Sequence, residues 1–331
     1  MDSSKVTIKE VAKKAGVSIA TVSRYFSNPA SLREKNLKKV EKAVKELNFQ
    51  PSAYARRLAG GKLNSFGLII PGYENIFYSY YALEIIRGIA TALEKEEIDL
   101  HLHVFWNKDT FKTSLIDGII FADIIGNKDQ LKRIKDEGVP IVVINRRMDE
   151  EELSYVAIDN FKGSFEATEF LINHGHKRIA HLAGNLEVQC ALERLDGYKR
   201  ALAKNGISAK PEYIKITNFS PREARERLEN LFSLSEPPTA IFCCSDEVAN
   251  EALIVCDEKQ IKIPDKVSII GFDDNPYCPH GNLMLTTVRQ PLEKMTSKGA
   301  EILQMIIEKE LPPQRVVLDT ELVIRDTVGF V

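Results

Sequence analysis

The sequence predicts two kinds of structure in one chain of 331 residues: a small all-helical unit at the N-terminus and a larger α/β unit. Two observations favour this class. Up to about residue 50 the apolar residues recur at helical spacing, whereas from Ser65 onward short apolar runs alternate with amphipathic stretches. Such alternation is typical of parallel, doubly wound sheets with helices on both faces. The length and the 44% hydrophobic content allow two or three domains with a substantial core.

The charge changes at the same place in the chain. Residues 1–64 contain 14 lysines and arginines against 5 acidic residues, a net charge of +9, and the remainder contains 31 against 42, a net charge of -11. This asymmetry indicates that only the N-terminal part meets a polyanion, although basic segments are also often solvated helix faces.

Composition also indicates the cellular compartment in which the protein is found. The N-terminus has no apolar signal region, and no uncharged run approaches the roughly 18 residues that a membrane span needs. The five cysteines are odd in number and lack Cys-x-x-Cys spacing, which is typical of buried or free thiols in a reducing compartment. We therefore expect a cytoplasmic protein that does not associate with membranes.

The first predicted element is a pair of short helices within residues 7–27. Thr7 and Glu10 have the spacing of a capping box, and Gly16 falls where the first helix must end. Ser18 is a good N-cap for a second short helix that carries Arg24. Two short helices joined by a tight glycine-containing turn form a helix-turn-helix, whose second helix is shaped to enter a DNA major groove. On spacing alone, an ordinary helical hairpin fits equally well.

A third helix and a conditional helix follow. Ser31 and Glu34 have the spacing of a second capping box, and the helix they predict can close a core over the first two. Pro51 ends it. Residues 51–58 favour helix by composition, but eight residues are fewer than the roughly 12–15 that an isolated helix needs in water. We predict that this segment is helical only when it is held by DNA and a second copy of itself.

The α/β unit is predicted to contain at least ten strands and several long helices. The strands are expected at residues 66–70, 100–105, 118–121, 141–144, 178–182, 240–243, 267–270, 285–288, 315–318 and 321–324. Helices are expected at residues 161–173, 189–205, 221–232 and 292–308. In such folds ligands bind beyond the carboxyl ends of the strands.

No pattern in the sequence indicates catalysis. The histidines lack metal-ligand spacing, and no Gly-x-Gly-x-x-Gly follows a predicted strand. Asp273 and Asp274 are adjacent, and neighbours at a strand end usually diverge, which argues against paired glycosidase carboxylates. We expect no enzyme activity, no cofactor and no metal.

Several motifs resemble one family. Val17-Ser-Ile-Ala-Thr-Val-Ser-Arg24, Leu47-Asn-Phe-Gln-Pro51 and Ala55-Arg-Arg-Leu58 look like the headpiece and hinge of lactose-repressor/galactose-repressor (LacI/GalR) regulators. The resemblance continues through the body in five motifs in the family's order: Gly175-His-Lys-Arg-Ile179, Arg194-Leu-Asp-Gly-Tyr198, Ser245-Asp-Glu247, Ile270-Gly-Phe-Asp-Asp274 and Leu285-Thr-Thr-Val-Arg-Gln-Pro291.

The resemblance implies a domain plan. Residues 1–50 would form a helix-turn-helix DNA-binding headpiece, residues 51–64 a hinge helix and linker, and residues 65–331 an effector-binding and dimerisation core. That core would be of the periplasmic-binding-protein type, with two α/β lobes joined by three crossovers and the ligand in the cleft. Lobe one would contain about 65–159 and 290–319, and lobe two about 160–289 and 320–331.

The resemblance also implies DNA contacts. Arg24 is the one recognition-helix residue able to read guanine bidentately, worth roughly 1–3 kcal/mol of discrimination, and Thr21 would mainly hold a phosphate. Leu58 resembles an apolar wedge in the minor groove, or else it packs against the body. The full implied set is Thr7, Ser18, Ile19, Ala20, Thr21, Ser23, Arg24 and Ser27 in the headpiece and Ser52, Ala55, Arg56 and Leu58 in the hinge. Ser27 stands where the family usually has asparagine.

The implied effector site lies between the lobes. Arg194 offers a planar fork of donors to sugar hydroxyls or a carboxylate, and Asp273 can accept from two adjacent hydroxyls; a structural salt bridge between the lobes is the alternative for both. The full set is Phe77, Tyr78, Asn145, Cys190, Arg194, Ser245, Asp246 and Asp273. Phe77 and Tyr78 would stack a ring face or belong to the core. Cys190 stands where purine-binding relatives place a polar group, so a saccharide is favoured over a purine.

Two departures from the family pattern lie in lobe one. The chain is about four residues longer between Asn75 and Arg87, and between Trp106 and Asp117 it is short enough to lose most of a helix. Both departures flank the cleft, so they weaken the aromatic assignments there.

The expected function is a homodimeric, sequence-specific DNA-binding transcriptional repressor on a pseudo-palindromic operator, controlled by a small molecule. No leucine-heptad tail follows residues 323–327, so we expect a dimer and not a tetramer. One alternative is a cytosolic sugar-binding or signalling module without a DNA function. Another is a family member controlled by a phosphorylated carrier protein, for which residues 292–300 offer no obvious docking site.

Overall fold

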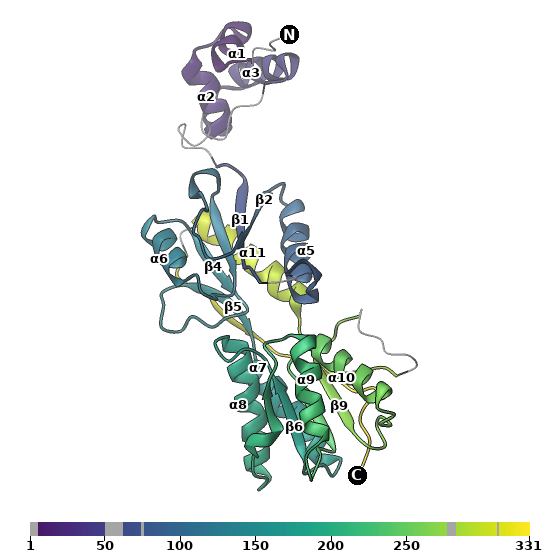
Figure 1. The fold of residues 1–331 in the computed structure, drawn as a ribbon. Helices are drawn as coiled ribbons and strands as arrows, with labels where there is room; N and C mark the ends of the chain where they lie inside the picture. Colours follow the sequence, from purple (N-terminus) through teal and green to yellow (C-terminus); the bar gives the residue numbers. More distant parts are fainter. Residues whose placement is uncertain (1–5, 50–61, 74–75, 277–282, 310) are drawn as a thin grey trace.

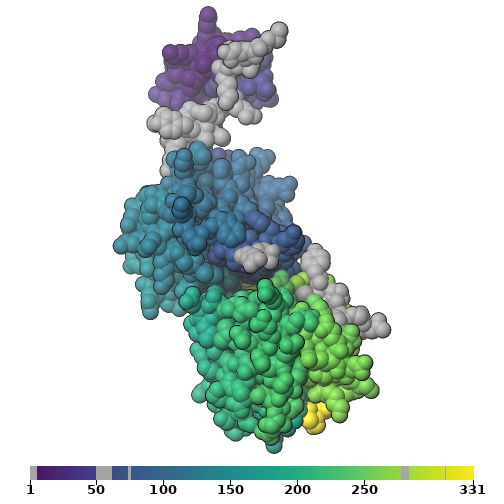
Figure 2. All heavy atoms as spheres, viewed as in Figure 1, coloured from purple at the N-terminus to yellow at the C-terminus, as the bar shows by residue number. Residues whose placement is uncertain are grey.

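The computed structural model describes residues 6–49, 62–73, 76–276, 283–309 and 311–331. Three bodies follow one another along the molecule: a helical headpiece, a first α/β lobe and a second α/β lobe (Figure 1). Figure 2 shows lobe two packed against the end of lobe one that lies away from the headpiece. This arrangement confirms the predicted fold class. Within the described ranges no helix is both long and apolar enough to cross a membrane.

The headpiece is a bundle of three helices, α1 (Ile8–Ala15), α2 (Ile19–Ser27) and α3 (Glu34–Leu47). Thr7 and Glu10 form the predicted capping box at the start of α1, and Gly16 ends that helix with a left-handed φ of 63°. Ser18 caps α2 as predicted. The bundle encloses a small apolar core of Val11, Ala12, Ala15, Val22, Val40, Ala43 and Phe49.

The second predicted capping box is wrong. A 3₁₀ turn, η1 (Pro29–Ser31), occupies the residues before α3, and the Ser31 hydroxyl donates to the Asn28 carbonyl at 2.7 Å. Because α3 begins only at Glu34, Glu34 is its first residue and not its third. Arg33 is the N-cap, without a side-chain capping bond among the described residues.

Each lobe is built on a six-stranded sheet. Lobe one has the strand order β11-β5-β4-β3-β1-β2, and lobe two has the order β12-β10-β9-β8-β6-β7. All pairs are parallel except β10 with β12. The first sheet contains β1 (Ser65–Pro71), β2 (Asp99–Phe105), β3 (Gly118–Ala122), β4 (Ile141–Ile144), β5 (Ser154–Ile158) and β11 (Arg315–Leu318). The second contains β6 (Ile179–Ala183), β7 (Ile214–Ile216), β8 (Ala240–Cys243), β9 (Ser268–Asp273), β10 (Thr286–Arg289) and β12 (Glu321–Val323).

Helices cover both sheets. In lobe one α5 (Tyr80–Glu94) and α11 (Leu292–Lys309) cover one face, and α6 (Lys128–Asp136) covers the other. In lobe two α7 (Asn160–Asn173) and α8 (Gln189–Lys204) cover one face, and α9 (Pro221–Phe232) and α10 (Asp246–Glu258) cover the other. The ten predicted strands are all present, within one to three residues at their ends. β5 and β7 were not predicted.

The chain crosses between the lobes three times. It passes from β5 to α7, from β10 to α11, and from β11 to β12. All three crossings therefore lie near one edge of each sheet, because β5 and β11 are neighbours in the first sheet and β10 and β12 in the second. β2 and β7 lie at the opposite edges.

One connection lacks a helix. Between β2 and β3 the chain makes only a 3₁₀ turn, η3 (Thr113–Leu115), as the short Trp106–Asp117 spacing predicts. Phe111 covers β1 in its place, so close that a Cβ at Gly67 would lie 2.7 Å from the Phe111 ring. Glycine at position 67 is what allows this approach.

Candidate functional site

The recognition helix α2 presents its first turn to solvent. Ile19 is 45% exposed, and Ala20 and Arg24 are also exposed. Residues four apart share a helix face, so Ala20 and Arg24 project from the same side. The Thr21 amide donates to the Ser18 Oγ at 3.1 Å, and the two hydroxyls lie 2.9 Å apart. These two side chains therefore fix the start of the helix as well as being available to a phosphate.

The structure describes only some of the other residues predicted to contact DNA. Ser23 and Ser27 are half-buried on α2, and the exposed Thr7 hydroxyl lies 3.0 Å from a Glu10 carboxylate oxygen. The hinge residues Ser52, Ala55, Arg56 and Leu58 lie outside the described residues, and so does the conditional helix at 51–58.

Arg194 is the centre of a buried polar cluster between the lobes. It extends from α8, and only 3% of its surface is exposed. Its Nε donates to the Asn160 Oδ1 at 2.9 Å and its Nη1 donates to the Cys244 carbonyl at 2.5 Å. The guanidinium lies flat over Phe272, 3.6 Å from the ring centroid. Two donors and an aromatic face thus hold the plane of the guanidinium in position.

Asp273 lies at the carboxyl end of β9, beside Asp246 at the start of α10. The Gln290 side chain donates to one Asp273 oxygen, and the Asp246 amide lies 3.4 Å from the other. Burial and the neighbouring Asp246 raise the pKa of Asp273 well above its usual range, although Arg194 opposes this. Burial also raises the pKa of Asp246, to about 6, against hydrogen bonds from Thr287 and the Asn275 amide.

Two further predicted effector residues lie at the ends of elements, and of these Cys190 lies close to Arg194 and Asp273. Asn145 follows β4 with a φ of 64°, and its buried Oδ1 has no hydrogen-bond partner among the described residues. Cys190 lies in the first turn of α8, and burial raises the pKa of its thiol to about 11. Ser245 instead caps α10, accepting from the Val248 amide at 3.3 Å. Because this hydroxyl already serves the helix, its effector role competes with a structural one.

The predicted aromatic pair lies apart from the buried cluster. Phe77 is 52% exposed and Tyr78 is 84% exposed, on the 3₁₀ turn η2 (Ile76–Tyr78). Neither belongs to the core in this conformation. A contact of either ring with an effector stays a prediction.

Several polar residues of the cluster were missed from sequence. Tyr81 on α5 points its hydroxyl into the protein interior with no partner in the described part of the chain, and the Oε1 of Gln290 is equally unsatisfied. Burial raises the pKa of Tyr81 well above its usual value. Asn160 orients Arg194, and Arg146 lies 3.3 Å from Asp123. No motif in the sequence pointed to Tyr81; only the Gln290 position, inside the motif at 285–291, carried a signal.

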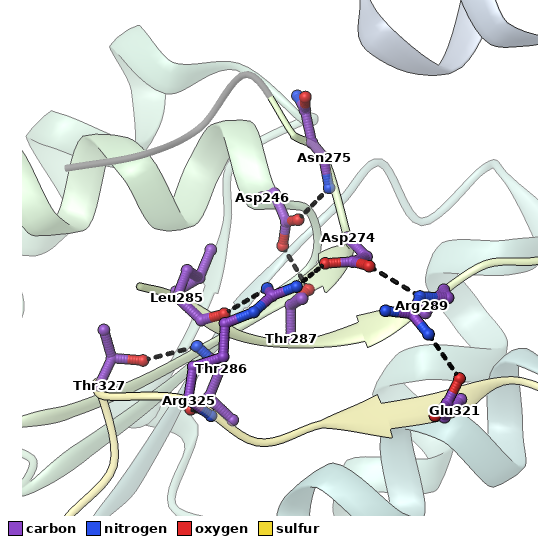
Figure 3. Close-up of polar contacts among 10 residues, drawn as sticks. All are labelled: Asp246, Asp274, Asn275, Leu285, Thr286, Thr287, Arg289, Glu321, Arg325 and Thr327. Carbon is purple, nitrogen blue, oxygen red and sulfur yellow. Dashed lines mark hydrogen bonds and ion pairs between the residues drawn. The ribbon is translucent and has the colours of Figure 1, made fainter. Parts of the chain in front are cut away.

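A second polar network joins the site to the crossovers (Figure 3). Asp274 accepts from the Arg325 Nη2 at 2.5 Å and from the Arg289 Nε at 2.7 Å, and Arg289 also donates to Glu321 at 2.8 Å. Asp273 and Asp274 both have positive φ, 138° and 59°. Partial burial alone would raise the pKa of Asp274, but the two arginines lower it. The network thus holds an unfavourable backbone conformation next to the buried carboxylate.

An open groove of about 720 Å³ lies outside the buried cluster, along α6 and residues 146–151 as far as Gln189. Among its charged side chains, Lys135 pairs with Glu151 at 2.6 Å. The groove is open to solvent, whereas Arg194 and Asp273 are enclosed.

An exposed recognition helix in front of a two-lobed core with an enclosed polar site defines the class: a two-lobed, DNA-binding transcription regulator. Residues 7–52 match the family model described as bacterial regulatory proteins, lacI family, and residues 168–328 match a periplasmic binding protein-like domain. The chain belongs to the LacI family. It is a transcription regulator and not an enzyme.

Relatives cover nearly the whole chain. It is 32% identical over 333 residues to the "Probable HTH-type transcriptional repressor ExuR" of Bacillus subtilis (strain 168), covering 98% of both chains. It is 32% identical over 317 residues to the catabolite control protein A of Priestia megaterium, covering 92% of this chain and 93% of that one. It is 31% identical over 335 residues to a repressor named PurR from Actinobacillus pleuropneumoniae serotype 3 (strain JL03), covering 97% and 98%.

Solved structures agree over the same length. A complex of the transcriptional regulator CelR with cellobiose has a TM-score of 0.75 at 27% identity, covering 98% of this chain and all of that one. The lac repressor dimer bound to operator and the anti-inducer ONPF has a TM-score of 0.82 at 23% identity, with the same coverage. The second likeness shows the fold alone.

Proposed function

We propose that this chain is a homodimeric repressor that binds a pseudo-palindromic operator and is released from it, or recruited to it, by a small saccharide. Two headpieces would read the two half-sites, and two hinge segments would meet in the central minor groove. The observation that supports effector control is the enclosed cluster around Arg194 and Asp273, in which the Tyr81 hydroxyl and the Gln290 Oε1 lack hydrogen-bond partners among the described residues. Buried polar atoms without partners cost free energy unless a ligand or water satisfies them.

The chemistry of the cluster favours a saccharide. A rigid guanidinium donates, a carboxyl and amide oxygens accept, and the Phe272 ring limits the space on one side. Alternating donors and acceptors at close range suit the adjacent hydroxyls of a sugar. The relative bound to cellobiose supports this class, whereas relatives named PurR keep a purine as the second candidate.

A thermal-shift screen of sugars, sugar phosphates and nucleosides tests the effector class. A bound ligand stabilises the folded protein by RT ln(1 + [L]/Kd), which is roughly 2.7 kcal/mol when the ligand concentration is a hundred times Kd. A stabilisation of this size raises Tm by a readily measured amount. Arg194→Gln should abolish the shift, whereas Arg178→Gln should keep it, because the Arg178 side chain donates to the Pro237 carbonyl at the far end of lobe two. A shift with nucleosides alone overturns the saccharide assignment.

Selection of operator sequences from a random DNA pool, followed by mobility shift at fixed salt, tests the DNA function. We expect an enriched pseudo-palindrome and an affinity that falls steeply with salt. Arg24→Ala should relax the preference at one base position in each half-site. If the protein enriches no sequence, the result supports the alternative, a cytosolic sugar-binding or signalling module without a DNA function.

A further inference from the structure

Apart from the crossovers, hydrogen bonds at two places join the lobes in the described part of the chain. The first is at the start of α5 in lobe one. The Tyr80 amide donates to the Oε1 of Glu247, which belongs to α10 in lobe two, at 3.0 Å. The N-cap residue of α5, Ser79, makes no side-chain capping bond to that helix within the described structure. A carboxylate from the opposite lobe therefore caps α5, where the amides and the helix dipole favour a negative charge.

The second contact joins the segment after β4 to the start of α8. The Gln189 side chain accepts from the Arg147 amide at 2.8 Å and donates to the Arg147 carbonyl at 3.3 Å. One side-chain amide thus pairs with both backbone groups of a single residue in the other lobe. The Arg147 guanidinium adds longer contacts, 3.6 Å to Asp159 and 3.9 Å to Glu193.

These contacts close the lobes over the polar cluster. Arg194, Asp273 and Asn145 are all at least nine-tenths buried with no effector present. Cys190 packs in a small apolar cluster with Val188 of lobe two and the partly buried Ile125 of lobe one. A sugar is too large to reach such side chains unless the lobes separate.

We propose that Glu247 and Gln189 form a two-point latch that keeps the lobes closed without effector and must open to admit it. The role of the cleft as an effector site rests on the proposed function; the latch itself does not. Two closed-state contacts that are absent when the lobes part bias the equilibrium toward the closed form. Effector entry is then limited by the fraction of molecules in which the latch is open.

Cys190 provides a readout that needs no effector. The four described cysteines are buried, but only Cys190 lies against the opposite lobe; Cys243 and Cys256 lie in the lobe-two core between the sheet and α9 and α10. Opening of the lobes exposes Cys190 and leaves Cys243 and Cys256 buried, whereas unfolding of lobe two exposes all three. The experiment measures N-ethylmaleimide modification of each cysteine by peptide mass spectrometry, in the full chain carrying Cys278→Ser.

Glu247→Ala should raise the modification rate of Cys190 roughly tenfold, the effect of losing one charge-assisted hydrogen bond. Glu247→Gln retains an acceptor and should give a smaller rise, and adding Gln189→Ala should give a larger one. Glu258→Gln is the matched control, because Glu258 is on the same helix but pairs with Arg225 within lobe two. Its Cys190 rate should equal that of the wild type.

The proposal is overturned if Glu247→Ala leaves the Cys190 rate unchanged, or if Cys190, Cys243 and Cys256 all become reactive together. Glu247 is distant in sequence from Cys190, so a selective effect is not a local disturbance. Because no effector or operator is added, a failed latch leaves the proposed function standing, and a failed effector screen leaves the latch standing.

Discussion

The two lobes share a sheet plan but cover it differently. In lobe two the passage from β7 to β8 runs through α9, which buries Ala224, Leu228 and Leu231 completely. In lobe one the corresponding passage from β2 to β3 has one 3₁₀ turn and the ring of Phe111 against Gly67. The comparison teaches that this sheet tolerates the loss of a covering helix where a strand supplies a glycine for close approach.

The lobes also differ in polar detail. In lobe two α7, α9 and α10 begin with side-chain caps and α8 does not, whereas the described N-caps of α5 and α6 in lobe one make no such bond. A fully buried histidine, His181, lies on β6, next to the edge strand β7, whereas the corresponding strand β1 has no titratable side chain. Lobe two therefore has more helices that begin with a side-chain cap, and we expect it to be the more sensitive to acid.

The largest expected difference between the lobes is in the stability lost when a residue that covers each sheet is truncated. Leu228→Ala on α9 should lower the free energy of unfolding by about 3–4 kcal/mol, because the side chain is fully buried. Phe111→Ala should cost about 1–2 kcal/mol, because the ring is only half-buried. Urea unfolding checks both, with Leu192→Ala on the exposed face of α8 as the control. A greater loss for Phe111→Ala would show that the short connection is as well packed as a helix.

Acid should weaken lobe two first. Burial lowers the pKa of His181 to about 4, so the folded protein keeps this ring neutral where the unfolded chain, with a pKa near 6.5, binds a proton. Stability contributed by the neutral ring is complete above pH 6.5 and falls by roughly 3 kcal/mol as the pH drops to 4. Hydrogen exchange between pH 6.5 and 4 should show β6 and β8 losing protection before β1 and β3.

The control for this prediction is His101→Gln on the exposed edge of β2, which should leave the pH dependence unchanged. His181→Gln should flatten it. Equal loss of protection in both lobes would mean that another group, shared between them, governs the acid sensitivity.

Two aspartates at strand ends should respond oppositely to loss of charge. The pKa of Asp274 is lowered by Arg289 and Arg325 despite partial burial, so Asp274→Asn should cost about 1–2 kcal/mol at pH 7. That cost shrinks as the pH falls below the unfolded-state value of about 3.9. Burial raises the pKa of Asp123 more than Arg146 lowers it, so Asp123→Asn should be neutral or stabilising at pH 7. Urea unfolding at pH 7 and at pH 3.5 distinguishes the two.

The smallest effect concerns the helix caps. Ser220 accepts from the Glu223 amide at 3.3 Å, so Ser220→Ala should destabilise lobe two by about 1 kcal/mol. Asn127, the N-cap of α6, makes no such bond, and both of its side-chain polar atoms are buried without partners in the described ranges. Asn127→Ala should therefore change Tm very little, and a loss equal to that of Ser220→Ala would remove this contrast between the lobes.

The fold was predictable where the pattern is local. Thr7 with Glu10, Gly16 and Ser18 lie within a few residues of the groups they bond, so spacing predicts them. The prediction at Ser31 was wrong because a 3₁₀ turn occupies Pro29–Ser31 and α3 begins only after it. The spacing of residues in the sequence does not reveal such a turn. β7 was missed because a three-residue strand has too little pattern.

The site was predictable only in part, because its contacts are non-local. Arg194 and Asp273 came from family motifs, not from spacing. The residues that orient or surround them, Asn160 and Tyr81, lie in helices that fit an ordinary amphipathic pattern. Glu247 and Gln189 belong to the same class: each is a polar residue in the first turn of a helix, and only the packing of one lobe on the other gives it a partner.

The three crossings also have a consequence for the order of events during synthesis. Lobe one needs α11 and β11, which the ribosome makes only after nearly all of lobe two. The headpiece is complete by Phe49, about 240 residues earlier than α11. At roughly 5–20 residues per second, this leaves the headpiece exposed on the ribosome for about 10–50 s before either sheet can be completed. For that interval the nascent chain is a small basic helical bundle beside an unfinished core, with its recognition helix already formed.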